Sequence, residues 1–186
     1  MGKIKLIVIL IMALLLFPVN IHAAREAGSS ARLVKNGKIA AASSVDYNLK
    51  KKVITEVLSK YNAPLVSEVD SFIETCTKYE IDCYLLPSIA GVESTFGKFT
   101  LQGSHNPFGW GGGLIMFDSW SDGIDAVGKG LRANYIDKWG ASTIEEIGPI
   151  YAASPTWAQK VHYFHNEFER VEEEKRLYFS KLEVEL

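Results

Sequence analysis

Apolar residues recur at helical spacing along most of the chain after residue 45, and this pattern predicts an all-α protein. The first predicted helix runs from Asp46 to Lys60. The second begins at Pro64, a residue that suits the first turn of a helix. The apolar faces of these two helices are Leu49, Val53, Val57 and Tyr61, then Leu65, Val69, Phe72, Ile73 and Cys76. We expect both faces to contribute to one core.

The apolar pattern is densest from Leu85 to Val92, which predicts a third helix. Pro87 is tolerated because it lies in the first turn, and Gly97 is the predicted helix stop. The segment that follows, residues 104–113, reads SHNPFGWGGG and has neither a helical nor a strand period. We expect a loop there, in which glycines let the backbone and the aromatic rings come close to a ligand.

Two further helices are predicted after this loop. The first begins near Asp118, with Ser119 or Ser121 as its N-terminal cap, and ends at Trp139 and Gly140. Its apolar face consists of Ile124, Val127, Leu131, Tyr135 and Ile136. Residues 142–146 open a second, short helix with acids in its first turn, where the helix dipole favours negative charge. Glu145 and Glu146 are therefore interpreted as helix-start residues rather than catalytic ones.

The last predicted helix follows a loop at residues 151–155 and is capped by Ser154 or Thr156. Its apolar seam, interrupted only by Lys175, consists of Trp157, Val161, Phe164, Phe168, Val171, Tyr178 and Leu182. We expect the first half to pack on the domain. Residues 172–186 are interpreted as a frayed or loosely packed helical tail, with self-association or a cover for the domain as alternatives.

The N-terminus has the pattern of a signal peptide, residues 1–23. Lys3 and Lys5 precede an apolar run at residues 6–17, and small residues around Ala23 offer a cleavage site. The run is shorter than the roughly 20 apolar residues that a membrane-spanning helix needs, although a retained anchor stays the alternative. Residues 24–44 are interpreted as a flexible spacer, which leaves residues 45–171 as the folded domain.

The charge of the chain bears on its possible partners. A net charge of −2 without a basic stripe argues against nucleic acid as a partner. Cys76 and Cys83 are the only two cysteines, and in an exported chain they are expected to form a disulfide, with two buried thiols as the alternative. His162 and His165 lack a third ligand nearby, so they are interpreted as surface or packing residues. We expect no metal and no cofactor.

Glu93 is the candidate for chemistry. It follows a largely apolar helix, where poor solvation favours the protonated carboxyl that a general acid needs. The alternative is a solvated helix-end glutamate paired with Lys98. Glycines beside aromatic rings in the following loop suit a carbohydrate cleft, although an ordinary glycine-rich loop has the same composition.

Four blocks of sequence resemble one family in order. They are Glu93-Ser94-x-Phe96-Gly97, then Asn106-Pro107-Phe108-Gly109, then Phe117-Asp118-Ser119-Trp120, then Tyr151-Ala152-x-Ser154-Pro155-x-Trp157-Ala158-x-Lys160-Val161. These blocks resemble the bacterial endo-β-N-acetylglucosaminidase-like domain, glycoside hydrolase family 73, within the lysozyme-like superfamily. The resemblance covers about residues 65–169, and four ordered blocks are far more specific than any single motif.

The resemblance implies a lysozyme-like helical domain that cleaves β-1,4 bonds in the peptidoglycan backbone of N-acetylglucosamine and N-acetylmuramic acid. Glu93 would be the general acid, and Tyr151 would lie close to it in the cleft. The implied substrate-binding residues are Ser94, Asn106, Phe108, Gly109 and Trp110. Trp157 is expected to belong to the core. We expect a secreted or cell-wall-associated monomer whose partner is the glycan strand, with membrane contact only through the signal peptide.

The second carboxylate is the point where the chain departs from the family. Many members carry an acid between the glutamate helix and the asparagine block, whereas residues 98–105 contain none. Asp118 is the possible second carboxylate, although it is interpreted first as a helix cap. Alternatives are therefore a lytic transglycosylase that forms anhydro-muramic ends, or assistance by the N-acetyl group of the substrate. A non-catalytic wall-binding module and a membrane-anchored structural protein whose tail recruits a partner also stay open.

Overall fold

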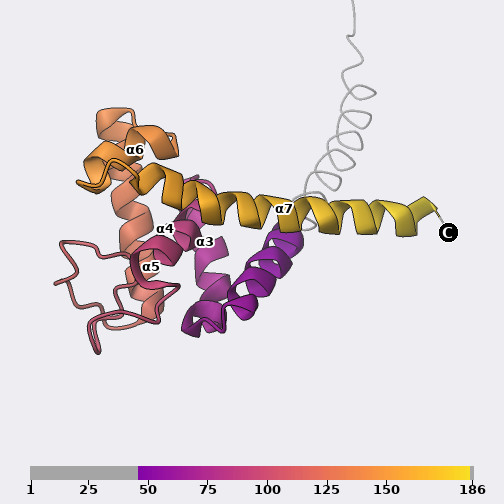
Figure 1. The fold of residues 1–186 in the computed structure, drawn as a ribbon, viewed down its shortest axis with the longest axis horizontal. Helices are drawn as coiled ribbons and strands as arrows, with labels where there is room; N and C mark the ends of the chain where they lie inside the picture. Colours follow the sequence, from indigo (N-terminus) through magenta and orange to yellow (C-terminus); the bar gives the residue numbers. More distant parts are fainter. Residues whose placement is uncertain (1–45, 185–186) are drawn as a thin grey trace, which may run out of the picture. The chain divides into compact units, whose positions relative to one another are not determined.

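In the computed structural model, residues 46–184 are described, with side chains to residue 181 (Figure 1). This part of the chain consists of helices and loops and contains no strand, so the all-α prediction is confirmed. The predictions for the signal peptide, residues 1–23, and the spacer, residues 24–44, fall outside the described residues. Among the described helices, none is long and apolar enough to span a membrane.

The N-terminal part of the fold consists of a helix at residues 46–60, the 3-10 turn η1 (Pro64–Glu68) and the helix α3 (Val69–Tyr79). The predicted second helix thus begins with a 3-10 turn, and Pro64 starts that turn. α3 ends at Glu80, whose backbone is left-handed with φ 50°. This reversal brings Cys83 back to Cys76, and a disulfide joins them with 4.9 Å between their Cα atoms.

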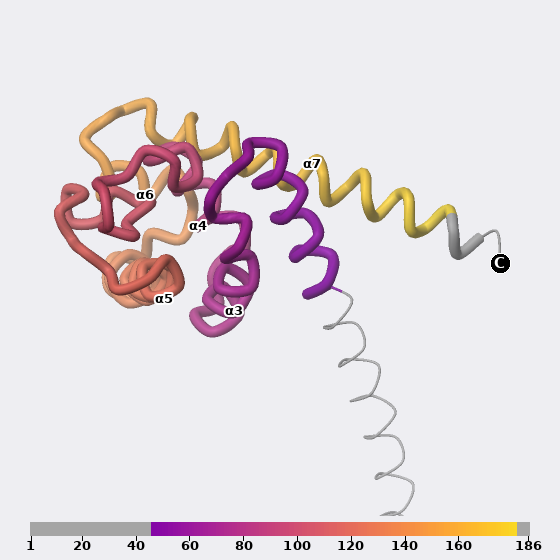
Figure 2. Tube along the Cα trace, turned by 90° about the horizontal axis from the view of Figure 1, so that it is seen from below, coloured from indigo at the N-terminus to yellow at the C-terminus, as the bar shows by residue number. Residues whose placement is uncertain are grey.

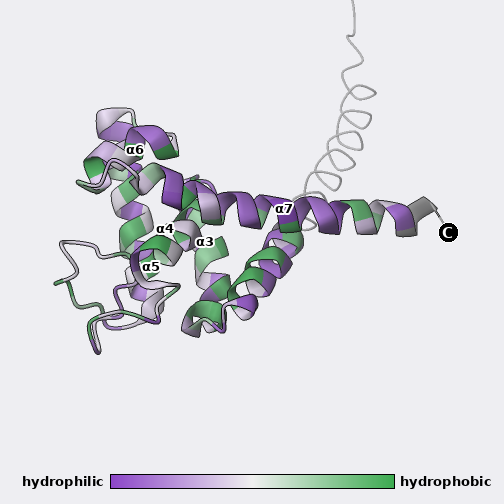
Figure 3. Cartoon of the chain, in the orientation of Figure 1, coloured by the Kyte–Doolittle hydropathy of each residue, from purple (hydrophilic) through white to green (hydrophobic). Residues whose placement is uncertain are grey.

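The helix α4 (Leu85–Ser94) lies at the centre and is buried on almost every side. Figure 2 shows it beneath α7 (Trp157–Val184), and the two helices are in contact. The contact is close because Gly91 has no side chain. A Cβ atom there would lie 2.8 Å from the Phe164 ring. The hydrophobic colour in Figure 3 gathers on α4 and its neighbours, while the C-terminal half of α7 is mostly hydrophilic.

α4 ends two residues earlier than predicted. Thr95, not Gly97, is the first left-handed residue, with φ 50°, and Phe96 and Gly97 continue in that region at 56° and 89°. The Phe96 N–H donates to the Ala90 carbonyl at 2.9 Å, and the buried Phe96 ring holds the turn in place. Packing of Phe96 thus offsets a backbone conformation that is unfavourable for a residue with a Cβ atom.

The next helical segment is continuous but changes from an α-helix to a π-helix. The helix α5 (Trp120–Gly130) is followed directly by the π-helix η2 (Leu131–Lys138), and Gly140 reverses the chain with φ 71°. Ser119 is the N-cap, since its hydroxyl accepts from the Asp122 N–H at 3.1 Å. The cap prediction for Ser119 is confirmed, and the interpretation of Asp118 as the cap is wrong.

The helix α6 (Ile144–Tyr151) begins with a capping box in which Thr143 and Glu146 bond each other's backbone N–H groups. Glu145 and Glu146 therefore lie in the first turn, as predicted. Tyr151 is the last residue of α6, so the prediction of a loop from residue 151 is wrong by one residue.

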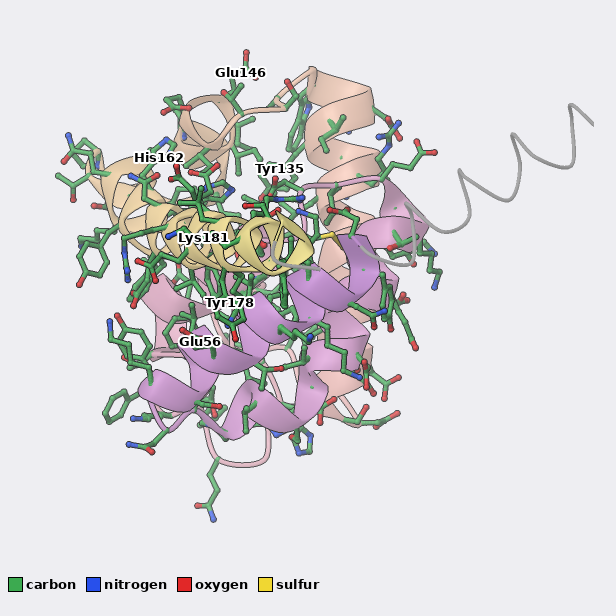
Figure 4. All side chains as sticks on the ribbon, turned by 90° about the vertical axis from the view of Figure 1, so that its right-hand side faces the viewer. Glu56, Tyr135, Glu146, His162, Tyr178 and Lys181 are labelled. Atoms are coloured by element: carbon green, nitrogen blue, oxygen red, sulfur yellow. A yellow bond between two sulfur atoms is a disulfide. The ribbon has the colours of Figure 1, made fainter. Side chains whose placement is uncertain are left out.

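α7 continues unbroken to Val184, and its second half is tied to the helix at residues 46–60. Glu172 accepts from Tyr84 at 2.5 Å and pairs with Lys50 at 3.4 Å, and Arg176 pairs with Asp46 at 3.0 Å. Figure 4, viewed from the C-terminal end of α7, labels Glu56, the ion-pair partner of Lys175. Residues 173–181 are mostly exposed, including Leu177 at 55% and Tyr178 at 61%, so polar contacts and not a buried apolar seam hold the second half of α7.

Candidate active site

Glu93 lies in the last turn of α4 and is half-buried. Its Oε1 accepts a hydrogen bond of 2.7 Å from the indole Nε1 of Trp157, the first residue of α7. Trp157 is buried, as expected for a core residue, but it is also the polar partner of the candidate acid. Lys98 is exposed, and no ion pair links it to Glu93 among the described residues, so the alternative of a helix-end ion pair is wrong.

The second oxygen of Glu93 faces Gly109. A Cβ atom at residue 109 would lie 3.2 Å from Oε2, and the backbone there is left-handed with φ 61°. Glycine satisfies both conditions, because it has no side chain and adopts positive φ without strain. Gly109 therefore lies beside the candidate acid.

A contiguous set of aromatic rings extends away from Glu93. Tyr151 stacks on Trp157 with 4.8 Å between ring centroids, and Trp110 and Tyr135 lie 5.8 and 6.1 Å from Tyr151. Trp139 continues the set at 5.4 Å from Tyr135. A cavity of about 280 Å³ is lined by Gly109, Trp110, Gly111, Gly112, Tyr135 and Tyr151. The cavity thus adjoins Glu93 through Gly109 and Tyr151.

Tyr151 connects α6 to the loop before the cavity. Its hydroxyl donates to the Phe108 carbonyl at 2.7 Å. Burial, the negative charge of Glu93 and the nearby Tyr135 raise the pKa of Tyr151 well above its ordinary value. The phenol therefore stays neutral and is engaged by the backbone, which leaves Tyr151 suited to hold the loop and present its ring.

Three of the predicted substrate-binding residues have side chains that pack beneath the surface of the site and support the loop at residues 104–113. Ser94 is buried and bonds the Pro107 carbonyl and the Gly97 N–H, both at 2.8 Å. Asn106 is buried and uses its whole amide within the loop, on Trp110 and the Ile115 carbonyl. Phe108 is fully buried. These side chains shape the floor of the site, but their polar groups are satisfied or hidden and do not face a ligand.

Trp110 is the predicted binding residue whose ring reaches the cavity. Its backbone N–H donates to Asn106 at 3.0 Å, which fixes the loop behind it. The ring is seated against α5 at Gly130, where a Cβ atom would lie 2.6 Å from the indole. The absence of a side chain at Gly130 therefore makes room for the aromatic wall.

Asp118 is not brought into the site. It is exposed, directly precedes the cap residue Ser119, and is not among the residues that line the cavity. No carboxylate belongs to the cavity lining in the described part of the chain. Within residues 46–184 no cluster of three His, Cys, Asp or Glu side chains is arranged to hold a metal ion.

A second cavity of about 630 Å³ lies between α6 and α7. Most of its lining residues are small, and its rim carries Glu145 and His162, which are 2.5 Å apart. Gly148 contributes to this lining and also lies against the Trp157 ring. His165 is half-buried and pairs with Asp82 at 3.0 Å, so both histidines have packing or surface roles.

Sequence reasoning missed Tyr135 and Trp139 as site residues and Trp157 as the partner of the acid. Tyr135 lies in the π-helix η2 and contacts the Trp110 ring, and Trp139 at the end of η2 contacts Tyr135. Comparison with protein-family models and with curated proteins found no match. The geometry of the site and the ordered sequence blocks are therefore the features of the chain that point to a function.

Proposed function

We propose that this protein is an exported peptidoglycan hydrolase that cleaves β-1,4 bonds of the glycan backbone, an endo-β-N-acetylglucosaminidase with Glu93 as general acid. The observation that carries the proposal is the placement of Glu93. One carboxyl oxygen is held by Trp157 at 2.7 Å, and the other faces Gly109 at the border of an aromatic cavity. A lysozyme-like arrangement of the helices is part of the same proposal.

The cavity suits a sugar. The apolar faces of a sugar ring pack on aromatic rings, and Trp110, Tyr135 and Tyr151 supply such rings. Its volume of about 280 Å³ is close to the lower limit of about 300 Å³ for ligand pockets, which suits a single sugar unit of a longer strand. Backbone groups of the glycine-rich loop are the natural partners for the hydroxyl and acetamido groups.

In the proposed reaction, Glu93 protonates the glycosidic oxygen as the bond to the anomeric carbon breaks, and positive charge develops on the sugar ring. The electron pair of that bond goes to the leaving oxygen. The exposed position of Asp118 favours one-acid chemistry, in which the N-acetyl group of the substrate stabilises the anomeric carbon before water attacks.

The same observation favours a second candidate, the lytic transglycosylase. There an internal hydroxyl of the muramic acid attacks the anomeric carbon and gives an anhydro end without water. Residues 1–23 support export, and the secreted or wall-associated location is a proposal on that basis.

Mass spectrometry of peptidoglycan digested with the purified protein tests the proposal. New reducing N-acetylglucosamine ends are expected. Anhydro-muramic ends would instead identify a transglycosylase. A protein that binds the wall but releases no fragments would refute the enzyme and leave a binding module.

A further inference from the structure

We infer that Trp157 gives the two oxygens of Glu93 different roles, so that Oε2 carries the transferable proton and Oε1 remains an acceptor. The inference rests on the proposed function and specifies how its acid is oriented. It makes Trp157 a positioning residue and Gly109 the neighbour that keeps space for the proton-bearing oxygen.

The hydrogen-bond chemistry of the indole supports this assignment. An indole N–H only donates, so Glu93 Oε1 must offer a lone pair across the 2.7 Å contact. In a protonated carboxyl, the carbonyl oxygen is a better acceptor than the hydroxyl oxygen. The proton is therefore favoured on Oε2, the oxygen that faces Gly109.

Packing fixes the direction from which Trp157 donates. The Trp157 side chain is 3% exposed, so its ring has little freedom to turn away. Tyr151 stacks on it at 4.8 Å and 25° between ring planes, and Gly148 approaches the ring closely enough that a Cβ atom would lie at 3.4 Å. The indole is clamped between α6 and α4 and reaches Glu93 from one direction only.

The arrangement also assists the proton transfer. As the glycosidic bond breaks, the O–H bond at Oε2 breaks, the proton forms an O–H bond with the glycosidic oxygen, and Glu93 becomes a carboxylate. A hydrogen bond to a charged acceptor is stronger than one to a neutral acceptor. The Trp157 bond therefore strengthens as the reaction proceeds, and such an interaction raises kcat rather than affinity.

Trp157→Phe is the first test, since phenylalanine keeps an aromatic ring against Tyr151 but has no N–H donor. We expect kcat to fall about tenfold, because a hydrogen bond to a charged acceptor exceeds one to a neutral acceptor by about 1.4 kcal/mol, which is tenfold in rate. KM is expected to change less than about twofold. Trp120→Phe is the matched control, because Trp120 lies at the start of α5 near His105 and does not contact Glu93. Turnover within about twofold of the unmodified protein in Trp157→Phe would overturn the inference.

A spectroscopic test is independent of catalysis. The chain has four tryptophans, and isotope-labelled protein gives one indole N–H resonance for each. In Glu93→Gln the acceptor of Trp157 changes, so its resonance is expected to move more than the other three. An unchanged Trp157 resonance would show that the hydrogen bond is absent, and the inference would be abandoned.

Gly109→Ala keeps the inference testable if Trp157→Phe fails to fold. The added methyl would lie 3.2 Å from Oε2, so turnover is expected to fall about tenfold or more while the Trp157 resonance persists. Gly103→Ala is the control, because its backbone is also left-handed, with φ 74°, and nothing lies within 4 Å of the added atom. Equal turnover in the two variants would refute the role of Oε2.

The outcomes separate this inference from the proposed function. If the unmodified protein cleaves no glycan, the proposed function fails and the role of Oε2 fails with it. If cleavage occurs and Trp157→Phe or Gly109→Ala behaves like its control, the function stands and only the inference is wrong.

Discussion

Removal of residues 172–186 is expected to destabilise the domain by about 2–4 kcal/mol while leaving the catalytic step intact. The largest contribution to this loss of stability is the removal of Glu172, which accepts a hydrogen bond from the Tyr84 hydroxyl at 2.5 Å. Tyr84 is only 2% exposed, so its hydroxyl would lose its partner in the interior, at a cost of about 1–3 kcal/mol. The Tyr84 hydroxyl is thus the largest single contribution to the expected loss of stability.

The other contacts of this segment are weaker. The pairs Lys175–Glu56 and Arg176–Asp46 are solvent-exposed and contribute about 0–1 kcal/mol each. Lys52 lies 5.0 Å from the centroid of the Phe179 ring, a cation–π contact of about 0.5–1 kcal/mol at an exposed site. Together they add roughly as much as the loss of the Tyr84 partner.

The measurement is urea unfolding of the full chain and of the truncated chain, followed by fluorescence. Glu172→Ala removes the acceptor of Tyr84 together with the pairs to Lys50 and Arg176. Glu173→Ala, one residue along and exposed, is its control. A truncated chain that loses less than about 0.5 kcal/mol would refute the reasoning, because that is the range of ordinary surface changes. Glycan cleavage by the truncated chain should persist, because Glu93 contacts the opposite end of α7.

Three further outcomes are expected. Glu93→Gln should lower glycan cleavage, measured by release of new chain ends, by at least about 10²–10⁴-fold with the fold intact. Cleavage by Asp118→Asn should remain within about threefold of the unmodified protein. A comparable loss of cleavage in Asp118→Asn would contradict one-acid chemistry. Reduction of the Cys76–Cys83 disulfide should cost about 2–3 kcal/mol in urea unfolding, and free thiols in oxidised protein would exclude the bond. Burial lowers the pKa of His165, but Asp82 and Glu169 together outweigh this effect and raise it overall. The pKa of Asp82 is lowered despite partial desolvation, because His165, the Tyr84 N–H and Lys50 favour its charged form. Stabilisation by this pair should therefore be lost as pH rises through the raised pKa of His165 and as pH falls through the lowered pKa of Asp82, and His165→Gln should flatten both limbs of the unfolding profile.

The helices were predictable because each buries one apolar stripe, and periodicity reports such stripes directly. The predicted faces of the helix at residues 46–60 and of α3 are buried, including Val53, Val57, Phe72 and Ile73. The start of α6 was also predictable, because Glu145 and Glu146 lie in the first turn, where the helix dipole favours negative charge. Features of this kind are predictable because they depend only on residues that are close together in the sequence.

Features that depend on distant partners were not predictable. The helix end at Thr95 depends on burial of Phe96, and no local rule places a left-handed threonine before an available glycine. The amide of Asn106 is consumed by Trp110 and Ile115, which only the folded loop brings within reach. The spacing of Trp157 predicts a core residue, whereas its hydrogen bond to Glu93 depends on a contact 64 positions away in the sequence.

The close crossing of α4 and α7 at Gly91 determines how Glu93 is aligned with Trp157. Gly91 and Glu93 are two residues apart on α4, while Phe164 and Trp157 are two helical turns apart on α7. A methyl group at residue 91 would lie 2.8 Å from the Phe164 ring, about 0.6 Å short of ordinary contact at 3.4 Å. We expect any larger residue at position 91 to displace α7 from α4 and to lengthen the hydrogen bond between Trp157 and Glu93. The bare backbone at residue 91 therefore sets the alignment of an acid that it does not touch.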